Sequence, residues 1–381
     1  MNLLFVVERP TQFEAPFFRF AAGRGEADLQ VLFTQPAPGG EVYDPELGRQ
    51  IAWGIDLLSG YPWTAAPEGA GSRWLAAEVA RRRPDLVVVN GYTRSRYLAA
   101  ALAARARGTA VALRTDSVLW PGTRRPALSR RLLYRRALPA LFRLFFTTGT
   151  LGRRYLEACG IAPDRIARFP YAVDVDHFRS ASALAPDERR ARRARLGLPE
   201  TARVVLAVAK MSGREAPWDL LRAASALPGD DLRLLLVGDG EERAALEGFA
   251  ASRLAGRAVF AGYVPYPELP ALYGLSDLFV HPAREERWGV SVAEAMAAGL
   301  PVVTSSRVGA APDLVAEGRN GFVYTAGRPD ELAASLTRAL ALPPGNVAGA
   351  DRDILASWDY AAAWRSLLEG AARAGASPLP R

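Results

Sequence analysis

The chain has 381 residues, half of them hydrophobic, which is too long for one ordinary core and favours two domains. Its single cysteine, Cys159, excludes an internal disulfide and a cysteine-rich zinc cluster, and no apolar run approaches the roughly 20 residues of a membrane span. The first residues, MNLLFVVERP, lack a basic region ahead of Glu8, so we expect no signal peptide and a cytoplasmic protein. The net charge of +8 favours an anionic partner, although an arginine-rich composition alone gives the same charge.

Short β-rich runs alternate with segments of helical periodicity, a pattern typical of parallel βα units rather than of hairpins. In the first half the expected strands are NLLFVVE, LQVLFT, DLVVVNG, TAVALRT, RLFFTTG and RIARFPY. In the second half they are RVVLAVAK, LRLLLVGDG, AVFAGY, DLFVHP, PVVTSS and GFVYTA. The sequence therefore predicts an α/β protein with two doubly wound, Rossmann-like domains that face each other across a cleft, with ligands at the carboxyl ends of the strands.

The polar, charge-dense segment SASALAPDERRARRARLGLPETA lies between the two halves and has the composition of a linker that runs into the first helix of the next unit. We place the domain boundary near residue 185, which gives an N-terminal domain of residues 1–185 and a C-terminal domain of residues 186–381. A final helix is expected at about residues 354–375, and packing of this helix back onto the N-terminal domain is one option.

Residues 277–303, DLFVHPAREERWGVSVAEAMAAGLPVV, are the most informative segment. A strand is expected to end at His281, and a helix is expected to open at Gly289 and to stop at Gly299. The free backbone amides at the start of such a helix form an anion-binding site. These amides belong to Val290, Ser291 and Val292.

Two carboxylates flank this helix start. Glu286 lies just before it, and Glu294 lies in the first turns of the helix. Carboxylates would repel a bound phosphate itself, but they would accept hydrogen bonds from the hydroxyls of a sugar and of a ribose attached to it. In isolation, a solvated loop charge for Glu286 and an exposed helix carboxylate for Glu294 are the simpler interpretations.

The sequence resembles the retaining glycosyltransferases of family 4, which have the GT-B fold, over most of its length. Glu286 and Glu294 match the E-x7-E signature of that family, and EAMAAGLPVV is close to its usual sequence. Three further stretches, FPYAVDVDHF, LLLVGDGEERAALE and FAGYVPYPELPALYGLSDLFVHP, resemble family segments in the same order. The resemblance implies metal-independent, hexosyltransferase-type transfer, without a cofactor and with retention, from a UDP- or GDP-sugar to an acceptor hydroxyl, in polysaccharide, glycolipid or small-molecule glycoside biosynthesis.

The same resemblance implies roles for particular residues. Lys210, the only lysine of the chain, and Arg214 would hold the nucleoside diphosphate. The family usually has a second lysine one position after Arg214, and here that position is Glu215. Glu286 would hold the hydroxyls of the sugar and Glu294 those of the ribose. The donor-binding set would be completed by Gly289, Val290, Ser291, Val292, Tyr263 and Gly238.

The N-terminal domain would bind the acceptor: a glycan, a lipid-linked sugar or a small molecule. The segments GYTRS, residues 91–95, and RTDS, residues 114–117, are expected at strand ends. Relatives often carry a histidine at the position of Asp116, which makes Asp116 the catalytic candidate for orienting the acceptor hydroxyl. A helix N-cap or a loop carboxylate is the alternative interpretation of Asp116.

No metal site is expected. The D-x-D pair Asp174 and Asp176 spells the metal motif of a different glycosyltransferase fold, but it falls at the end of the N-terminal domain and is interpreted as structural. Neither of the two histidines, His177 and His281, shows a ligand or triad pattern. Nucleic acid is not expected as a partner.

Residues 123–146, TRRPALSRRLLYRRALPALFRLFF, cluster arginine with leucine, tyrosine and phenylalanine at helical spacing. One interpretation is an interfacial helix that docks on anionic lipid, which would make the protein peripheral at the inner face of the membrane. The other is that long arginine side chains cover a buried helix. Two rival functions also stay open: a sugar-nucleotide epimerase of the same architecture, and a non-catalytic protein that binds an anionic glycan or lipid.

Overall fold

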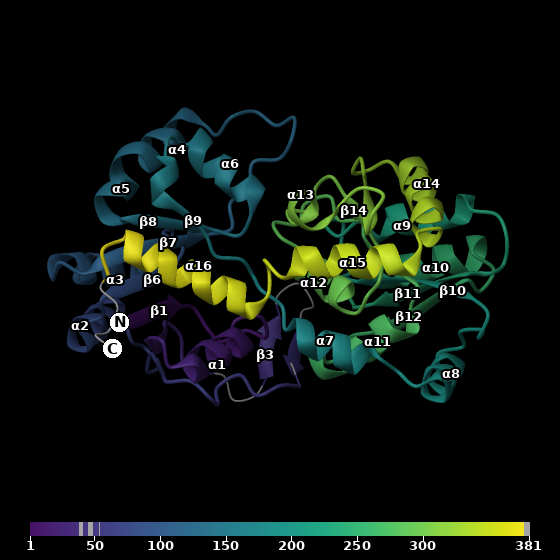
Figure 1. The fold of residues 1–381 in the computed structure, drawn as a ribbon, viewed down its shortest axis with the longest axis horizontal. Helices are drawn as coiled ribbons and strands as arrows, with labels where there is room; N and C mark the ends of the chain where they lie inside the picture. The colour runs from purple at the N-terminus through teal and green to yellow at the C-terminus, as the bar shows by residue number, and fades with distance from the viewer. Residues whose placement is uncertain (38–40, 45–48, 53, 377–381) are drawn as a thin grey trace. The chain divides into compact units, whose positions relative to one another are not determined.

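The computed structural model describes residues 1–37, 41–44, 49–52 and 54–376 (Figure 1). Two compact units make up the chain. Unit 1 comprises Met1–Gly40, Ile55–Ala172 and Tyr360–Arg381, and unit 2 comprises Glu41–Gly54 and Val173–Asp359. Within the described ranges, no helix is both long enough and apolar enough to cross a membrane.

Unit 1 is built on a seven-stranded sheet with the order β5-β2-β1-β6-β7-β8-β9. All neighbours in this sheet pair in parallel. Because helices cover a parallel sheet, its strands are nearly continuous runs of buried apolar residues. The strands are β1 (Asn2–Val7), β2 (Asp28–Phe33), β5 (Trp63–Ala65), β6 (Leu86–Asn90), β7 (Ala110–Thr115), β8 (Leu144–Thr147) and β9 (Ile166–Arg168).

The helices of unit 1 follow from amphipathic segments between these strands. In α3, for example, Tyr97, Ala100, Ala101 and Ala104 recur at helical spacing and are buried. The helical segments are α1 (Ala15–Arg24), α2 (Ser72–Arg82), α3 (Ser95–Ala106), α4 (Leu128–Leu132), the π-helical turn η1 (Leu133–Ala137), α5 (Leu138–Leu141), α6 (Thr150–Ala158), the 3-10 turn η2 (Pro163–Arg165) and α16 (Tyr360–Arg373).

Unit 2 is built on a six-stranded parallel sheet with the order β12-β11-β10-β13-β14-β15. Its first strand, β10, lies between β11 and β13, so the order reverses at this point of the sheet. In doubly wound sheets, ligands bind beyond the carboxyl ends of the strands at such a reversal. The strands are β10 (Arg203–Val208), β11 (Leu232–Val237), β12 (Ala258–Gly262), β13 (Leu278–His281), β14 (Val302–Ser305) and β15 (Gly321–Tyr324).

The helices of unit 2 begin at several prolines, which suit the first turn because they lack an amide hydrogen. Pro186, Pro217, Pro329 and Pro344 each open a helix. The helical segments are α7 (Val175–Ser182), α8 (Pro186–Arg195), α9 (Pro217–Ala226), α10 (Arg243–Arg253), the 3-10 turn η3 (Tyr266–Glu268), α11 (Leu269–Leu275), α12 (Val290–Ala297), α13 (Ala311–Leu314), α14 (Pro329–Leu340) and α15 (Pro344–Leu355).

The architecture of two parallel-sheet α/β domains predicted from the sequence is confirmed, and each strand expected from the sequence is present. The structure adds β5 and an antiparallel pair of β3 (Glu41–Asp44) and β4 (Arg49–Ala52). The described residues therefore include an antiparallel strand pair, although the periodicity indicated parallel βα units. These strands are only three or four residues long, too short for periodicity to reveal them.

The polar segment between the halves is not a free linker, because α7 and α8 both pack on α11 within unit 2. Arg193 of α8 is buried. Its guanidinium donates to the carbonyls of Leu275 and Ala202 and pairs with Asp277 at 2.9 Å. The predicted boundary near residue 185 lies inside unit 2, which begins again at Val173.

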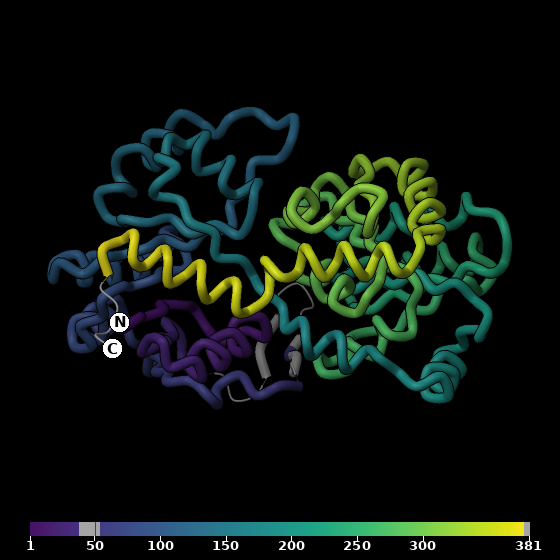
Figure 2. The backbone as a smooth tube through the Cα atoms, viewed as in Figure 1, coloured from purple at the N-terminus to yellow at the C-terminus, as the bar shows by residue number. Residues whose placement is uncertain are grey.

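The chain returns to unit 1 at its end, where α16 forms the last helix (Figure 2). This helix packs on β9 and α1. Tyr360 contacts the ring of Phe17 edge-on, and the Ser366 hydroxyl donates to the carbonyl of Arg168.

Candidate active site

The site in unit 2 lies at the carboxyl ends of three adjacent strands. β11, β10 and β13 are neighbours in the sheet, and the segments that follow them are residues 238–242, 209–216 and 282–289. Among the residues predicted for the donor site, these three segments contain Lys210, Arg214, Gly238, Glu286 and Gly289. The parallel sheet therefore brings together side chains that are up to 80 positions apart in the sequence.

Gly238 allows the first two of these segments to touch. Its φ is +138°, and a Cβ at this position would lie 2.0 Å from the carbonyl oxygen of Ala209, so only glycine fits. Next to it, the amide of Met211 donates to the carbonyl of Asp239 at 3.0 Å. Gly238, predicted to bind the donor, thus fixes the backbone directly beside Lys210.

Lys210 is half-buried immediately after β10, where it lines a small pocket. Met211, Glu215, Val237 and Pro282 line the same pocket. Lys210 therefore lies where the carboxyl ends of β10, β11 and β13 meet.

Arg214 pairs with two carboxylates in the structure. Its guanidinium lies 2.8 Å from Glu215 Oε1 and 3.5 Å from Glu286 Oε2. The carbonyl of Arg214 accepts from the amide of Arg284 at 2.8 Å, which ties the segment after β10 to the loop after β13. Arg284 itself pairs with the fully buried Asp219 at 3.0 Å.

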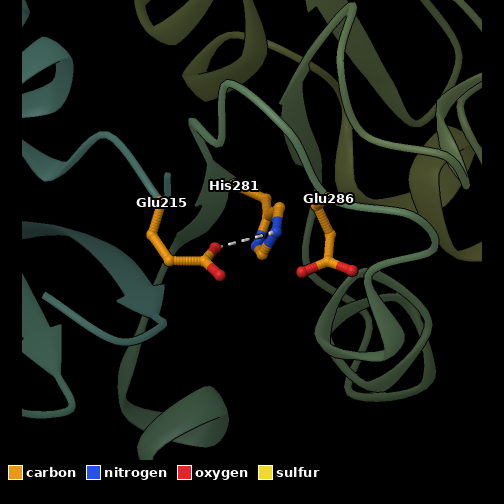
Figure 3. A group of neighbouring side chains, drawn as sticks. All are labelled: Glu215, His281 and Glu286. Atoms are coloured by element: carbon orange, nitrogen blue, oxygen red, sulfur yellow. Dashed lines mark ion pairs between the residues drawn. The ribbon is translucent and has the colours of Figure 1, made fainter. Parts of the chain in front are cut away.

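Glu215, His281 and Glu286 form a cluster that the sequence did not reveal (Figure 3). One potential ligand atom from each lies within 4.8 Å of the others, and His281 Nε2 is 3.7 Å from Glu215 Oε2. His281 is buried, and burial lowers the pKa of its imidazole, with a smaller opposing effect from Glu286. These are residue types that bind divalent metals. However, the guanidinium of Arg214 already supplies a positive charge to both carboxylates.

The helix after this loop is α12, and it begins as predicted directly after Gly289, whose φ is +95°. The prediction of three free amides is wrong for Val292, because its amide donates to the carbonyl of Gly289 at 3.1 Å. The left-handed turn at Gly289 folds its carbonyl back toward the first turn and produces this bond. The amides of Val290 and Ser291 remain at the helix N-terminus, and the Ser291 hydroxyl lies 3.4 Å from His281 Nδ1.

Glu294 lies inside unit 2 and is not an exposed helix carboxylate, since only 3% of it is accessible. Its Oε2 accepts a hydrogen bond of 2.8 Å from the hydroxyl of Tyr273 on α11. Burial raises the pKa of Glu294 to about 7, and the Tyr273 hydrogen bond opposes this shift. Glu286 is partly buried instead, and its Oε1 accepts from the amide of Trp288 at 3.2 Å.

Two further predicted site residues, and the D-x-D pair that was interpreted as structural, lie elsewhere. Tyr263 directly follows β12 in unit 2 and is half-buried. Asp116 directly follows β7 in unit 1 and is also half-buried, between Thr115 and Ser117, which are joined by a hydroxyl hydrogen bond of 3.1 Å. Asp174 of the D-x-D pair accepts from the amide of His177 at 3.0 Å and so caps α7.

The carboxyl ends of the strands in unit 1 carry a buried ion pair that sequence analysis missed. Glu14 Oε1 accepts from Arg114 at 2.6 Å and from Asn90 at 2.8 Å. The Arg114 guanidinium also stacks on the rings of Phe169 and Tyr171, with centroids 4.5 and 4.4 Å away. The charge of Arg114 at the carboxyl ends of these strands is therefore neutralised by Glu14.

A signal for the missed residues of unit 2 was present in the sequence. His281 stands at the end of one expected strand, and Glu215 follows the end of another by five residues. A doubly wound sheet with β10 at the reversal places those two strands side by side. Knowledge of the strand order would therefore have brought Glu215 next to His281. No comparable signal existed for Glu14 and Arg114, because β6 lies between β1 and β7 in the sheet.

Comparison with protein families identifies a known domain in unit 2. Residues 188–351 match the model of the family described as Glycosyl transferases group 1. Unit 2 carries a glycosyl transferases group 1 domain. This stretch contains Lys210, Arg214, Glu286, Glu294 and the start of α12.

Among curated proteins, the D-inositol 3-phosphate glycosyltransferase of Mycobacterium tuberculosis is 32% identical over 209 residues. The match covers 53% of this chain and 42% of that protein, so the chain matches less than half of its relative.

Solved structures match almost the whole chain. A glycosyltransferase from Rickettsia africae has a TM-score of 0.77 at 14% identity, with 98% of both chains covered. HepE from Anabaena in complex with UDP has a TM-score of 0.74 at 18% identity, with 97% of this chain and 99% of HepE covered. These likenesses establish the fold, which is of the GT-B type.

Proposed function

We propose that this protein transfers a hexosyl group from a nucleoside diphosphate sugar to an acceptor hydroxyl, with retention of the anomeric configuration. The observation that carries the proposal is the convergence, in a glycosyl transferases group 1 domain, of Lys210, Arg214 and the N-terminus of α12 at adjacent strand ends. Two cations and a helix N-terminus suit a diphosphate. Unit 2 would hold the donor and unit 1 the acceptor.

The diphosphate is the leaving group of this reaction, so negative charge grows on it as the bond to the sugar breaks. Preorganised donors aimed at such charge are among the largest contributions to enzyme catalysis. Lys210 would provide a compact ammonium, and the amides of Val290 and Ser291 would provide fixed dipoles. These groups are held in place by the backbone contacts of Gly238 and Gly289.

Arg214 has to change partners in this account. In the structure its guanidinium neutralises Glu215 and Glu286. About 41% of the Arg214 side chain is exposed, so it can turn from Glu286 toward a bound diphosphate while Glu215 retains one edge of the guanidinium. Glu286 would then be released to accept hydrogen bonds from hydroxyls of the donor sugar.

Glu294 would accept from the ribose hydroxyls of the nucleotide. Its position on α12 supports a role in which one oxygen is fixed by the Tyr273 hydroxyl and the other meets the ligand. In unit 1, Asp116 at the end of β7 would orient the acceptor hydroxyl. The acceptor is a glycan, a lipid-linked sugar or a small molecule in this proposal.

A uridine nucleotide is the first choice of donor. HepE from Anabaena has been solved with UDP and with UDP-glucose, and an Escherichia coli protein titled trehalose-6-phosphate with UDP-2-fluoro glucose. These ligands belong to those proteins, and we propose a UDP-sugar for this chain because the fold is shared and the cationic strand ends suit a diphosphate.

Incubation of the purified protein with individual nucleotide sugars tests the proposal. Release of nucleoside diphosphate, with an α-linked product by proton NMR from an α-linked donor, is the expected result. A β-linked product would exclude retention. Inversion at C2 without nucleotide release would indicate an epimerase, and complete inertness toward UDP-, GDP-, ADP- and dTDP-sugars would indicate a binding protein.

A further inference from the structure

The arginine-rich segment, residues 117–156, has an unusual charge pattern. It contains nine arginines and no aspartate or glutamate. The segment runs from the loop after β7 through α4, α5 and β8 into α6, and all of it belongs to unit 1. A stretch of this length with one sign of charge creates a positive surface potential.

The segment has an inner and an outer side in the structure. Tyr134 and Leu138 are buried in the core of unit 1. Leu128 and Leu132 of α4, one turn apart, are 67% and 46% exposed. The interpretation that arginines cover a buried helix explains why Tyr134 and Leu138 are buried. It does not explain the exposure of Leu128 and Leu132, because α4 buries none of its own side chains.

The arginines near these leucines in the sequence are not neutralised by ion pairs with the described residues. Arg124, Arg125, Arg131, Arg135 and Arg136 make no ion pair with any residue in the described part of the chain. All of them except Arg131 are exposed. Two exposed leucines are thus flanked in sequence, on both sides, by arginines that make no ion pair with the described residues, which gives a surface with apolar and cationic side chains.

We propose that this surface docks on an anionic lipid bilayer, with Leu128 and Leu132 at the boundary between headgroups and acyl chains and the arginines on lipid phosphates. An apolar face flanked by Arg is the signature of interfacial helices. Each basic residue near an anionic leaflet adds about fivefold to the affinity. A polynucleotide would pair with the arginines but would leave the two leucines in water.

Co-sedimentation with vesicles tests this docking surface. The protein is mixed with vesicles of phosphatidylcholine alone or with added phosphatidylglycerol, without donor or acceptor, so the result is independent of transferase activity. We expect binding to the anionic vesicles, little binding to the neutral ones, and a loss of binding as salt is raised.

Matched variants separate this surface from general charge. Leu128→Ser should weaken vesicle binding about tenfold. Leu102→Ser is the control, because Leu102 on α3 is 60% exposed and belongs to the same unit. Arg124→Gln with Arg125→Gln should weaken binding more than tenfold. Arg105→Gln with Arg107→Gln, which removes the same charge at the C-terminal end of α3, should weaken it less.

Thermal melting of each variant should match the wild type, because the substituted side chains are exposed. Wild-type protein that stays in the supernatant with anionic vesicles would overturn the proposal. Equal losses for Leu128→Ser and Leu102→Ser would also overturn it, as would competition by a single-stranded polynucleotide that is unaffected by Leu128→Ser.

Discussion

The polar side chains at the carboxyl ends of the two sheets differ in burial and in how they are paired. In unit 1, Glu14, Asn90 and Arg114 are joined in a buried cluster between aromatic rings. In unit 2, Lys210 and Arg214 are half-buried or exposed, and Arg214 shares its charge between two carboxylates. A buried ion pair is held in place by its surroundings, whereas an accessible cation can exchange partners for a ligand.

The largest effect we expect is on the stability of unit 1. Arg114→Ala leaves the Glu14 carboxylate buried without its cation, which should cost roughly 3–5 kcal/mol of unfolding free energy. Calorimetric melting measures the loss. Arg105→Ala on α3 removes an exposed arginine from the same unit and should change little. A melting temperature for Arg114→Ala equal to that of the control would contradict the buried-pair account.

A buried carboxylate in unit 2 gives the complementary test. Asp351 accepts from Asn320 at 2.8 Å, and burial raises its pKa to about 7. A carboxyl group whose pKa is higher in the folded protein binds more protons there, so stability should fall as pH rises from about 4 to 7, by up to about 4 kcal/mol. Asp351→Asn keeps the shape and should remove the part of this dependence that comes from Asp351, leaving the part from Glu294. An unchanged pH profile of the melting temperature would show that Asp351 is ionised throughout.

Substitution of Lys210 tests whether the accessible cations of unit 2 act on a bound ligand. If it neutralises the departing diphosphate, Lys210→Ala should lower kcat about a hundredfold or more, roughly 2.7–4 kcal/mol of barrier, with a nearly unchanged melting temperature. Lys210→Arg keeps the charge but reshapes the head group, so it should recover only part of the rate. Arg253→Ala, at an exposed position of α10, is the control. Full activity of Lys210→Ala would leave Arg214 and the α12 amides as the only charges on the diphosphate.

The two carboxylates of the predicted signature should behave differently. Glu286→Ala should impair turnover while the free nucleoside diphosphate still binds, because the proposed contact is with the sugar. Glu294→Ala should weaken the nucleotide itself, through the ribose contact. Calorimetric titration with free nucleotide separates the two variants, and equal losses of nucleotide affinity would remove the division of roles.

Metal removal should have the smallest effect. In our proposal, Lys210, Arg214 and the helix amides would supply the charge that the diphosphate needs, so we expect activity to survive EDTA. Loss of turnover in EDTA that manganese or magnesium restores would instead assign a metal to Glu215, His281 and Glu286, since Asp174 caps α7.

The sequence predicted the strands and the start of α12 well because each depends on local signals. β10, β13 and Gly289 are marked by apolar runs and by glycine within a few residues. Contacts between distant segments were missed. Glu14 and Arg114 are 100 positions apart in the sequence, and their contact depends on the path of the chain between β1 and α1. The amide of Val292 was misjudged because the carbonyl direction of Gly289 depends on its left-handed φ.

Hydrogen–deuterium exchange with and without UDP tests the central claim most directly, because it locates the nucleotide on the chain. The account predicts slower exchange at residues 209–216 and at 286–292, with the strand ends of unit 1 unchanged by the nucleotide alone. Slower exchange confined to unit 1, around residues 90–95 and 114–117, would contradict the assignment of the donor to unit 2.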